Sequence, residues 1–129
     1  MIIDASALIA ILREEPEGER FRSAIATAES RRISAATYVE SAIVIDAARD
    51  PIASRRLDDF LQRTQTEIVP LSVSQAILAR EAYRSFGKGS GHPARLNFGD
   101  CLAYALAKET GEPLLFKGDD FARAGIDAA

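Results

Sequence analysis

The chain has 129 residues, of which 47% are hydrophobic and 27% are charged, and these values indicate one globular domain over residues 1–129 rather than two. Its 16 basic and 19 acidic residues leave a net charge of −3, so a broad cationic surface for nucleic acid is not expected. The single cysteine, Cys101, excludes an intramolecular disulfide, and no uncharged stretch is long enough for a transmembrane helix or a signal peptide, so we expect a cytoplasmic protein without membrane contact.

The beginning of the chain predicts a buried strand that leads into helices. The apolar run Met1-Ile2-Ile3 ends at Asp4, and an apolar helix follows it as far as Leu12. Because that helix is apolar on every side, a subunit interface is one candidate for covering the face that the sheet does not cover. Residues 17–29 then carry apolar side chains at helical spacing, which predicts an amphipathic surface helix.

Two strands and three helices are expected in the middle of the chain. A strand at 32–36 is followed by a helix that Thr37 opens and that continues through Ala48, where Asp50-Pro51 breaks it. The remaining elements are a helix at 51–65, a strand at 67–71, and a helix that Ser72 or Ser74 caps and that ends near Phe86.

The last third of the chain contains a glycine-rich loop, a final helix and a final strand. Three glycines and one proline lie between Gly87 and Pro93, which predicts a mobile loop. A helix opened by Asn97 runs through Thr110 and is followed by a strand at 114–116. The alternation of strands and helices predicts an α/β fold, with a central parallel sheet of four to five short strands wrapped by helices and joined by right-handed connections.

Acidic residues follow the predicted strands, at the edge where open α/β sheets bind ligands. Glu40 and Asp100 are each followed by apolar residues three, four and seven positions later, so we expect both carboxylates to point inward. The candidate acids are Asp4, Glu40, Asp100, Asp119 and Asp120.

Carboxylates that cluster in a protein interior are costly to ionise, because burial and mutual repulsion both raise their pKa values. A divalent cation removes that conflict. Oxygen ligands with room left for water and a substrate phosphate suit Mg²⁺ or Mn²⁺ rather than zinc. The sequence therefore favours a magnesium or manganese site at this edge of the sheet.

Helix capping is the alternative explanation for each acid taken singly. Thr37-x-x-Glu40 matches a capping box, Asn97-x-x-Asp100 approximates one, and Asp4 is placed to cap the first helix. Asp120 fits equally well as a surface acid in a turn. Capping does not explain why the helices that follow successive strands each carry an acid at the start of their inward-facing apolar side. The occurrence of several such acids together favours the metal site.

Other polar residues carry weaker signals. The only histidine, His92, has no neighbouring nucleophile with which to form a triad, and Cys101 is expected to be a packed thiol. The stretch from Ala82 to Gly99 contains basic residues and no acid, and it is the one locally basic stretch of any length. The cations nearest to the acids in the sequence are Arg84, Lys88, Arg95 and Lys117.

Four sequence blocks, spread over essentially the whole chain, are informative in combination. They are Met1-Ile2-Ile3-Asp4-Ala5-Ser6-Ala7-Leu8, Tyr38-x-Glu40, Leu96-Asn97-Phe98-Gly99-Asp100-Cys101-x-Ala103-Tyr104, and Leu114-Leu115-Phe116-Lys117-Gly118-Asp119-Asp120-Phe121. Together they resemble the PIN-domain ribonucleases and, more narrowly, the VapC toxins of type II toxin-antitoxin pairs. The resemblance implies a PIN-like fold, cleavage of RNA with inhibition of growth, a homodimer, and inhibition by a cognate VapB-type antitoxin.

The resemblance also assigns roles to individual residues. The family's metal-binding acids match Asp4 and Asp100, and one acid of the final pair completes the set with Glu40. We favour Asp119 for that place, because Asp120 precedes a phenylalanine that should anchor the turn. The implied site is therefore Asp4, Glu40, Asp100 and Asp119 as catalytic acids, of which Asp4 and Asp100 bind the metal, with Ser6, Asn97 and Asp120 in support.

The expected chemistry is hydrolysis by a metal-activated water that Glu40 or Asp119 orients, which leaves a 5′-phosphate and a 3′-hydroxyl. Two other functions remain open. A metal-dependent phosphotransfer or phosphatase domain would use an acid after the first strand and a lysine after the last, and Lys117 is placed for that role. The second alternative is a non-catalytic module that binds RNA or a protein. The candidate acids argue against it, because such a module has no need of an anionic pocket.

Overall fold

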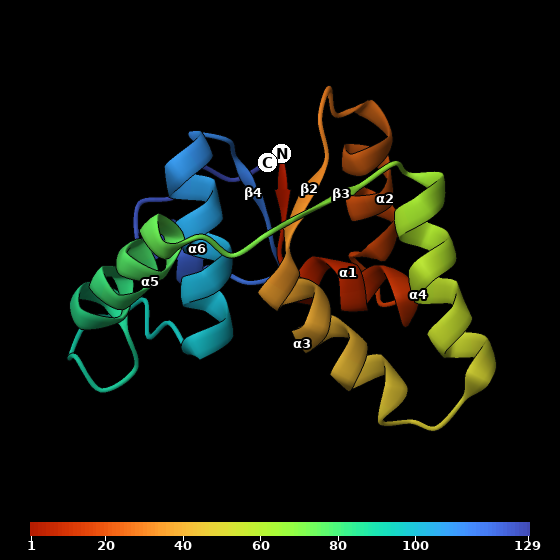
Figure 1. The fold of residues 1–129 in the computed structure, drawn as a ribbon, viewed down its shortest axis with the longest axis horizontal. Helices are drawn as coiled ribbons and strands as arrows, with labels where there is room; N and C mark the ends of the chain where they lie inside the picture. The colour runs from red at the N-terminus through yellow and green to blue at the C-terminus, as the bar shows by residue number, and fades with distance from the viewer.

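The computed structural model describes residues 1–129 and is built around a four-stranded parallel sheet (Figure 1). The strands lie in the order β3-β2-β1-β4, with Ile2 of β1 in register with Arg32 of β2 on one side and Leu114 of β4 on the other. Their bounds are β1 (Ile2–Ile3), β2 (Arg32–Ser34), β3 (Glu67–Val69) and β4 (Leu114–Leu115). The predicted α/β fold with a parallel sheet is confirmed, with four strands.

Helices cover both faces of the sheet. Figure 1 shows α5 and α6 on one side of the sheet and α1, α2 and α4 on the other, with α3 leading away from the lower end of β2. The buried residues accordingly form two apolar clusters, one centred on α6 and one on α1 and α2. The helices are α1 (Ala5–Leu12), α2 (Gly18–Thr27), α3 (Ala35–Asp46), α4 (Pro51–Arg63), α5 (Val73–Phe86), α6 (Phe98–Thr110) and α7 (Asp120–Arg123).

Local signals explain most of the helix ends. Ser72 is the N-cap of α5, and its side chain accepts the backbone N–H of Gln75. At the other end of the neighbouring helix, Gly111 adopts the left-handed conformation (φ 69°) that terminates α6. The short helix α7 was not predicted, because one turn is too short to show a periodic pattern.

The predicted boundary between the second strand and its helix is wrong. The strand β2 ends at Ser34, and α3 begins at Ala35 rather than at Thr37, because the Ser34 side chain accepts the backbone N–H of Ala36 and caps the helix. Thr37 is therefore inside α3, where it is buried and its hydroxyl has no hydrogen-bond partner. The predicted capping box between Thr37 and Glu40 does not form.

The first helix is apolar on every side, as predicted, but it needs no subunit interface to cover it. Its residues Ala7, Leu8, Ala10 and Ile11 are fully buried. The helices α2, α3 and α4 all pack against α1, so its outer face is covered within the chain. None of the seven helices is long and apolar enough to cross a membrane.

Candidate functional site

Asp4 lies at the carboxyl end of the central strand β1 and is also the N-cap of α1. Its Oδ2 accepts hydrogen bonds from the backbone N–H and the hydroxyl of Ser6, at 3.0 and 2.6 Å. Its Oδ1 is buried and has no hydrogen-bond partner, although a buried carboxylate oxygen is costly to leave unpaired. Burial raises the pKa of Asp4. One oxygen of this acid is therefore held by the cap, and the other is left for a cation.

Ser6 connects Asp4 to the last strand. Its hydroxyl oxygen accepts the backbone N–H of Lys117, just beyond β4, at 3.0 Å while its proton goes to Asp4. The orientation of the Asp4 carboxylate thus depends on the pairing of the first and last strands. This arrangement gives Ser6 the geometry of a polar support.

Asp100 lies in the first turn of α6 and forms a reciprocal capping box with Asn97. Its side-chain Oδ2 accepts the backbone N–H of Asn97 at 2.9 Å, and the Asn97 side chain accepts the backbone N–H of Asp100 at 2.8 Å. The helical face below Asp100 is buried as predicted, through Ala103, Tyr104 and Ala107. Capping occupies only one of the two carboxylate oxygens, so the cap and a ligand role are compatible.

Glu40 lies near the middle of α3 and is partly exposed. The prediction that its apolar face points inward is wrong, because Ile43 is 64% exposed and the buried positions of α3 are Thr37, Ser41 and Ile45. Its carboxylate instead packs against the first turn of α6, where a Cβ placed on Gly99 would lie 1.8 Å from Glu40 Oε2. The absence of a side chain at Gly99 gives the carboxylate its place next to Asp100.

Four acids interact electrostatically at this edge of the sheet. Burial, followed by the charges of Asp4 and Asp100, raises the pKa of Glu40 to about 6. Burial also raises the pKa of Asp100 to about 6, against the hydrogen bond from Asn97, and the charges of Asp4 and Asp120 add to the rise. We call Asp4, Glu40, Asp100 and Asp120 the carboxylate cluster. Their mutual repulsion is the conflict that a bound cation would relieve.

The two acids of the final pair, Asp119 and Asp120, have different surroundings. Asp119 precedes α7 with a side chain that is 70% exposed, and it pairs with Arg123 one turn later at 2.8 Å. Asp120 is the acid whose charge acts on Asp100. The choice of Asp119 as the fourth acid therefore stays a prediction, and the ion pair of Asp119 with Arg123 together with the charge of Asp120 on Asp100 favours Asp120 as the alternative.

The carboxylate cluster fits a metal that is held only in part by the protein. No three acid, histidine or cysteine side chains lie at the spacing of a closed ligand set. Mg²⁺ commonly keeps several waters and takes one or two carboxylates together with substrate oxygens. The buried, unpartnered Oδ1 of Asp4 and the all-oxygen donor set suit such an ion.

The candidate cations fall into two groups. Arg84, Lys88 and Arg95 are exposed and form no ion pair, so their charges are available to a polyanion. Lys117, in contrast, pairs with Glu15 at 2.8 Å and with Glu17 at 3.5 Å. Lys117 is thus the one candidate cation that already has acidic partners, and the same two pairs engage the lysine that a phosphotransfer site would use.

The two remaining polar candidates are structural. Nδ1 of His92 accepts the backbone N–H of Ala94 at 3.1 Å, and its ring contacts Phe86 edge to face. Cys101 is buried, and burial raises the pKa of its thiol to about 11, so it is a packed thiol as predicted.

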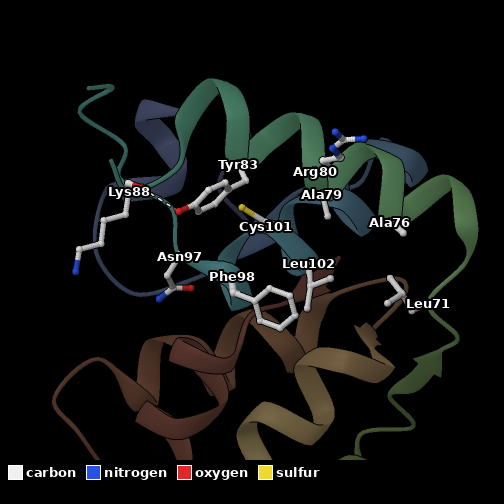
Figure 2. Close-up of a pocket in the computed structure, with 10 residues that line it drawn as sticks. All are labelled: Leu71, Ala76, Ala79, Arg80, Tyr83, Lys88, Asn97, Phe98, Cys101 and Leu102. Atoms are coloured by element: carbon white, nitrogen blue, oxygen red, sulfur yellow. Dashed lines mark hydrogen bonds between the residues drawn. The ribbon is translucent and has the colours of Figure 1, made fainter. Parts of the chain in front are cut away.

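A groove of about 600 Å³ between α5 and α6 was not predicted (Figure 2). Asn97 and Phe98 line it beside the carboxylate cluster, and the hydroxyl of Tyr83 donates to the backbone oxygen of Lys88 at its end. Phe98 is 79% exposed, although aromatic side chains are usually covered. Leu71, which also lines the groove, is exposed, and so are Val39 and Ile43 of α3 and Val73 and Ile77 of α5.

Comparisons with known proteins extend over almost the whole chain. Residues 1–127 match the family model described as PIN domain. The chain is 53% identical over 129 residues to Ribonuclease VapC28 of Mycobacterium tuberculosis, which covers 100% of this chain and 97% of that protein. It is 47% identical over 128 residues to Ribonuclease VapC of Mycolicibacterium smegmatis, which covers 99% of this chain and 98% of that protein.

Two solved structures share the fold at low sequence identity. VapC20 of Mycobacterium tuberculosis, described as a sarcin-ricin loop cleaving toxin, superposes with a TM-score of 0.76 at 14% identity over 99% of this chain and 97% of that chain. FitAcB of Neisseria gonorrhoeae superposes with a TM-score of 0.72 at 18% identity over 99% of this chain and 96% of that chain.

Proposed function

Because the chain belongs to the PIN-domain family, with full-length VapC ribonuclease relatives that are toxins of toxin-antitoxin systems, we propose that its carboxylate cluster is the centre of a metal-dependent endoribonuclease. The observation that carries this proposal is the buried, unpartnered Oδ1 of Asp4 in the midst of acids whose pKa values are raised. A site arranged in this way is incomplete without a cation. Hard oxygen donors select Mg²⁺ or Mn²⁺.

Each acid has a separate role in the proposed reaction. Asp4 and Asp100 hold the ion, because each has one oxygen fixed by a cap and the other free. A bound divalent ion supplies Lewis acidity toward the scissile phosphate and the attacking water. Glu40, whose pKa lies near 6, is suited to orient that water and accept its proton at neutral pH. Asp120 supplies the remaining negative charge beside Asp100.

The substrate is RNA held by cations outside the carboxylate cluster. Four acids repel a phosphate backbone, so binding requires positive charge close by. Arg84, Lys88 and Arg95 have no acidic partner and lie on the segment that leads into α6. We assign these three residues to the RNA backbone and leave Lys117 out of that group, because it is paired with Glu15 and Glu17.

Two protein partners complete the proposal. A cognate VapB-type antitoxin inhibits the enzyme, as the toxin-antitoxin assignment requires. A second copy of the chain covers the exposed aliphatic side chains Val39, Ile43, Val73 and Ile77 and forms a homodimer, since such side chains are normally buried. Sedimentation of wild type beside Ile43→Arg tests this surface, and an unchanged dimer in the variant, or a monomeric wild type, contradicts it.

The deciding experiment is cleavage of a defined RNA by the purified protein with Mg²⁺, with Mn²⁺ and with EDTA. We expect cleavage that requires the metal and leaves 5′-phosphate ends, because the attacking group is a water. Addition of the cognate antitoxin should abolish the cleavage. Cleavage that persists in EDTA, or products with a 2′,3′-cyclic phosphate, would contradict the proposed mechanism.

A further inference from the structure

Gly99 stands apart from the other glycines of the chain. Five glycines of turns and loops adopt positive φ angles that other residues rarely adopt, but Gly18, Gly87 and Gly99 do not. A Cβ at Gly18 or Gly87 would first meet a backbone oxygen, whereas a Cβ at Gly99, in the first turn of α6, would meet the side chain of an acid. Glycine is a poor helix former, so nothing in the backbone favours it at this position. What distinguishes Gly99 is its contact with Glu40. A Cβ would lie 1.8 Å from Oε2, 2.5 Å from Cδ and 2.8 Å from Oε1 of that side chain.

We propose that Gly99 is a positioning residue of the nuclease site. Because it has no side chain, the Glu40 carboxylate can pack directly against the backbone of α6. This inference rests on the proposed function of the carboxylate cluster. Glu40 is a flexible side chain on a partly exposed part of α3, and Asp4 and Asp100 both repel it. Contact with the bare backbone of α6 is what keeps its carboxylate beside Asp100. The first turn of a helix also carries a partial positive charge that favours an anion there.

The substitution Gly99→Ala separates this role from a structural one. With alanine at position 99, the Glu40 carboxylate must retreat by about 1.6 Å to reach an ordinary contact distance of 3.4 Å. Displacing a catalytic group by about 1 Å typically costs up to about a hundredfold in rate, so we expect kcat to fall by about 10- to 100-fold. The fold should survive, because the clashing atoms are the end of a flexible side chain and alanine is the better helix former. Activity is lost while the melting temperature stays the same or rises.

A double-mutant cycle with Glu40→Asp tests the contact itself. Aspartate is one methylene shorter, so its carboxylate withdraws from α6 and leaves room for the alanine methyl group. We expect Gly99→Ala to lower kcat by less than about threefold in the Glu40→Asp background, against about 10- to 100-fold in wild type. Equal losses in the two backgrounds would overturn the proposal. Lys108→Ala, an exposed substitution at the far end of α6, is the matched control and should leave cleavage unchanged.

Two further readouts do not depend on turnover. In a crystal structure of Gly99→Ala without metal, the Glu40 carboxylate should lie about 1.6 Å further from the backbone of α6 than in wild type. An unmoved Glu40 carboxylate overturns the proposal. If Gly99→Ala fails to fold, recovery of the fold in the double variant supports the contact, and failure of both variants contradicts it. A wild type that lacks metal-dependent cleavage refutes the proposed function instead, while the position of the Glu40 carboxylate in Gly99→Ala still tests the contact with Gly99.

Discussion

At the start of α6, the side chain of Asn97 accepts the backbone N–H of Asp100 at 2.8 Å, and the side chain of Asp100 accepts the backbone N–H of Asn97 at 2.9 Å. The capping role of Asp100 needs only a side-chain oxygen that accepts a hydrogen bond, which an amide also provides. The proposed metal role needs the negative charge. Substitution can therefore remove one role and keep the other.

Asp100→Asn should lower metal-dependent cleavage by at least about a hundredfold, a loss typical of removing a key electrostatic group from an active site. Its melting temperature should stay close to that of wild type, because asparagine still accepts the Asn97 N–H. Asn97→Ala is the converse control. It breaks the cap and should cost about 1 kcal/mol of unfolding free energy, while the Asp100 charge remains. A folded Asp100→Asn variant with full activity would exclude Asp100 as a ligand.

The last pair of acids provides a second prediction. Asp120→Asn should reduce cleavage strongly, because Asp120 is the acid whose charge reaches Asp100. Asp119→Asn should leave cleavage within about threefold of wild type, because it removes only an exposed ion pair with Arg123, and such pairs contribute little. Cleavage rates of the two variants, measured side by side at saturating Mg²⁺, decide between the acids. The opposite order of activities would restore Asp119 as the fourth acid.

Stability should depend on pH and metal in a linked way. The pKa values of Glu40 and Asp100 are raised to about 6 in the fold, from ordinary values of 4.5 and 3.8. Between about pH 4 and pH 6 the folded state then binds more protons than the unfolded state, so these two groups lower the unfolding free energy as pH rises through that window. Well above pH 6 both carboxyls are ionised in the folded state, so the unfolding free energy carries the full loss and no longer changes with pH through these two groups.

Mg²⁺ or Mn²⁺ should therefore raise the melting temperature clearly at pH 7.5 and little at pH 5, because the ion binds the ionised carboxylates. Thermal unfolding at both pH values, with and without the metal, measures the difference. Glu40→Gln should be at least as stable as wild type at pH 7.5 without metal, since one repulsive charge is gone. A metal effect of equal size at both pH values would argue against the carboxylate cluster as the binding site.

The cations before α6 provide a test of RNA binding. Replacing Arg84, Lys88 and Arg95 by alanine should weaken RNA binding and lower the slope of log affinity against log salt by about 2, since each lost contact with single-stranded RNA removes about 0.7. Metal affinity should hardly change. Lys117→Ala is the matched control, because it removes a cation that is paired with Glu15 and Glu17. An unaltered slope in the triple variant would remove this segment from the substrate site.

The positions of two candidate acids in the fold could be predicted because they depend on local signals. Asp4 follows a short apolar strand, and Asp100 stands three residues after the asparagine that caps its helix, so both positions follow from neighbours in the chain. Parallel pairing then brings the carboxyl ends of the strands to one edge. The fold class and these two acids could thus be predicted without a structure.

The parts that were missed depend on tertiary contacts. In α3 the polar residues Thr37 and Ser41 are buried while Ile43 is exposed, so the apolar pattern pointed to the wrong face. The pairing of Lys117 with Glu15 joins residues 102 positions apart, which no local pattern reveals. The one-turn helix α7 brings Arg123 within 2.8 Å of Asp119, an ion pair that a helix too short to show periodicity conceals in the sequence.

The hydrogen bond from the Lys117 backbone to Ser6 spans 111 positions of the chain and holds the group that orients Asp4. The functional geometry of the first strand therefore depends on the segment that follows β4, although the two lie at opposite ends of the sequence. A substitution that loosens the pairing of β1 with β4 would therefore disturb the orientation of Asp4 without touching any acid of the carboxylate cluster.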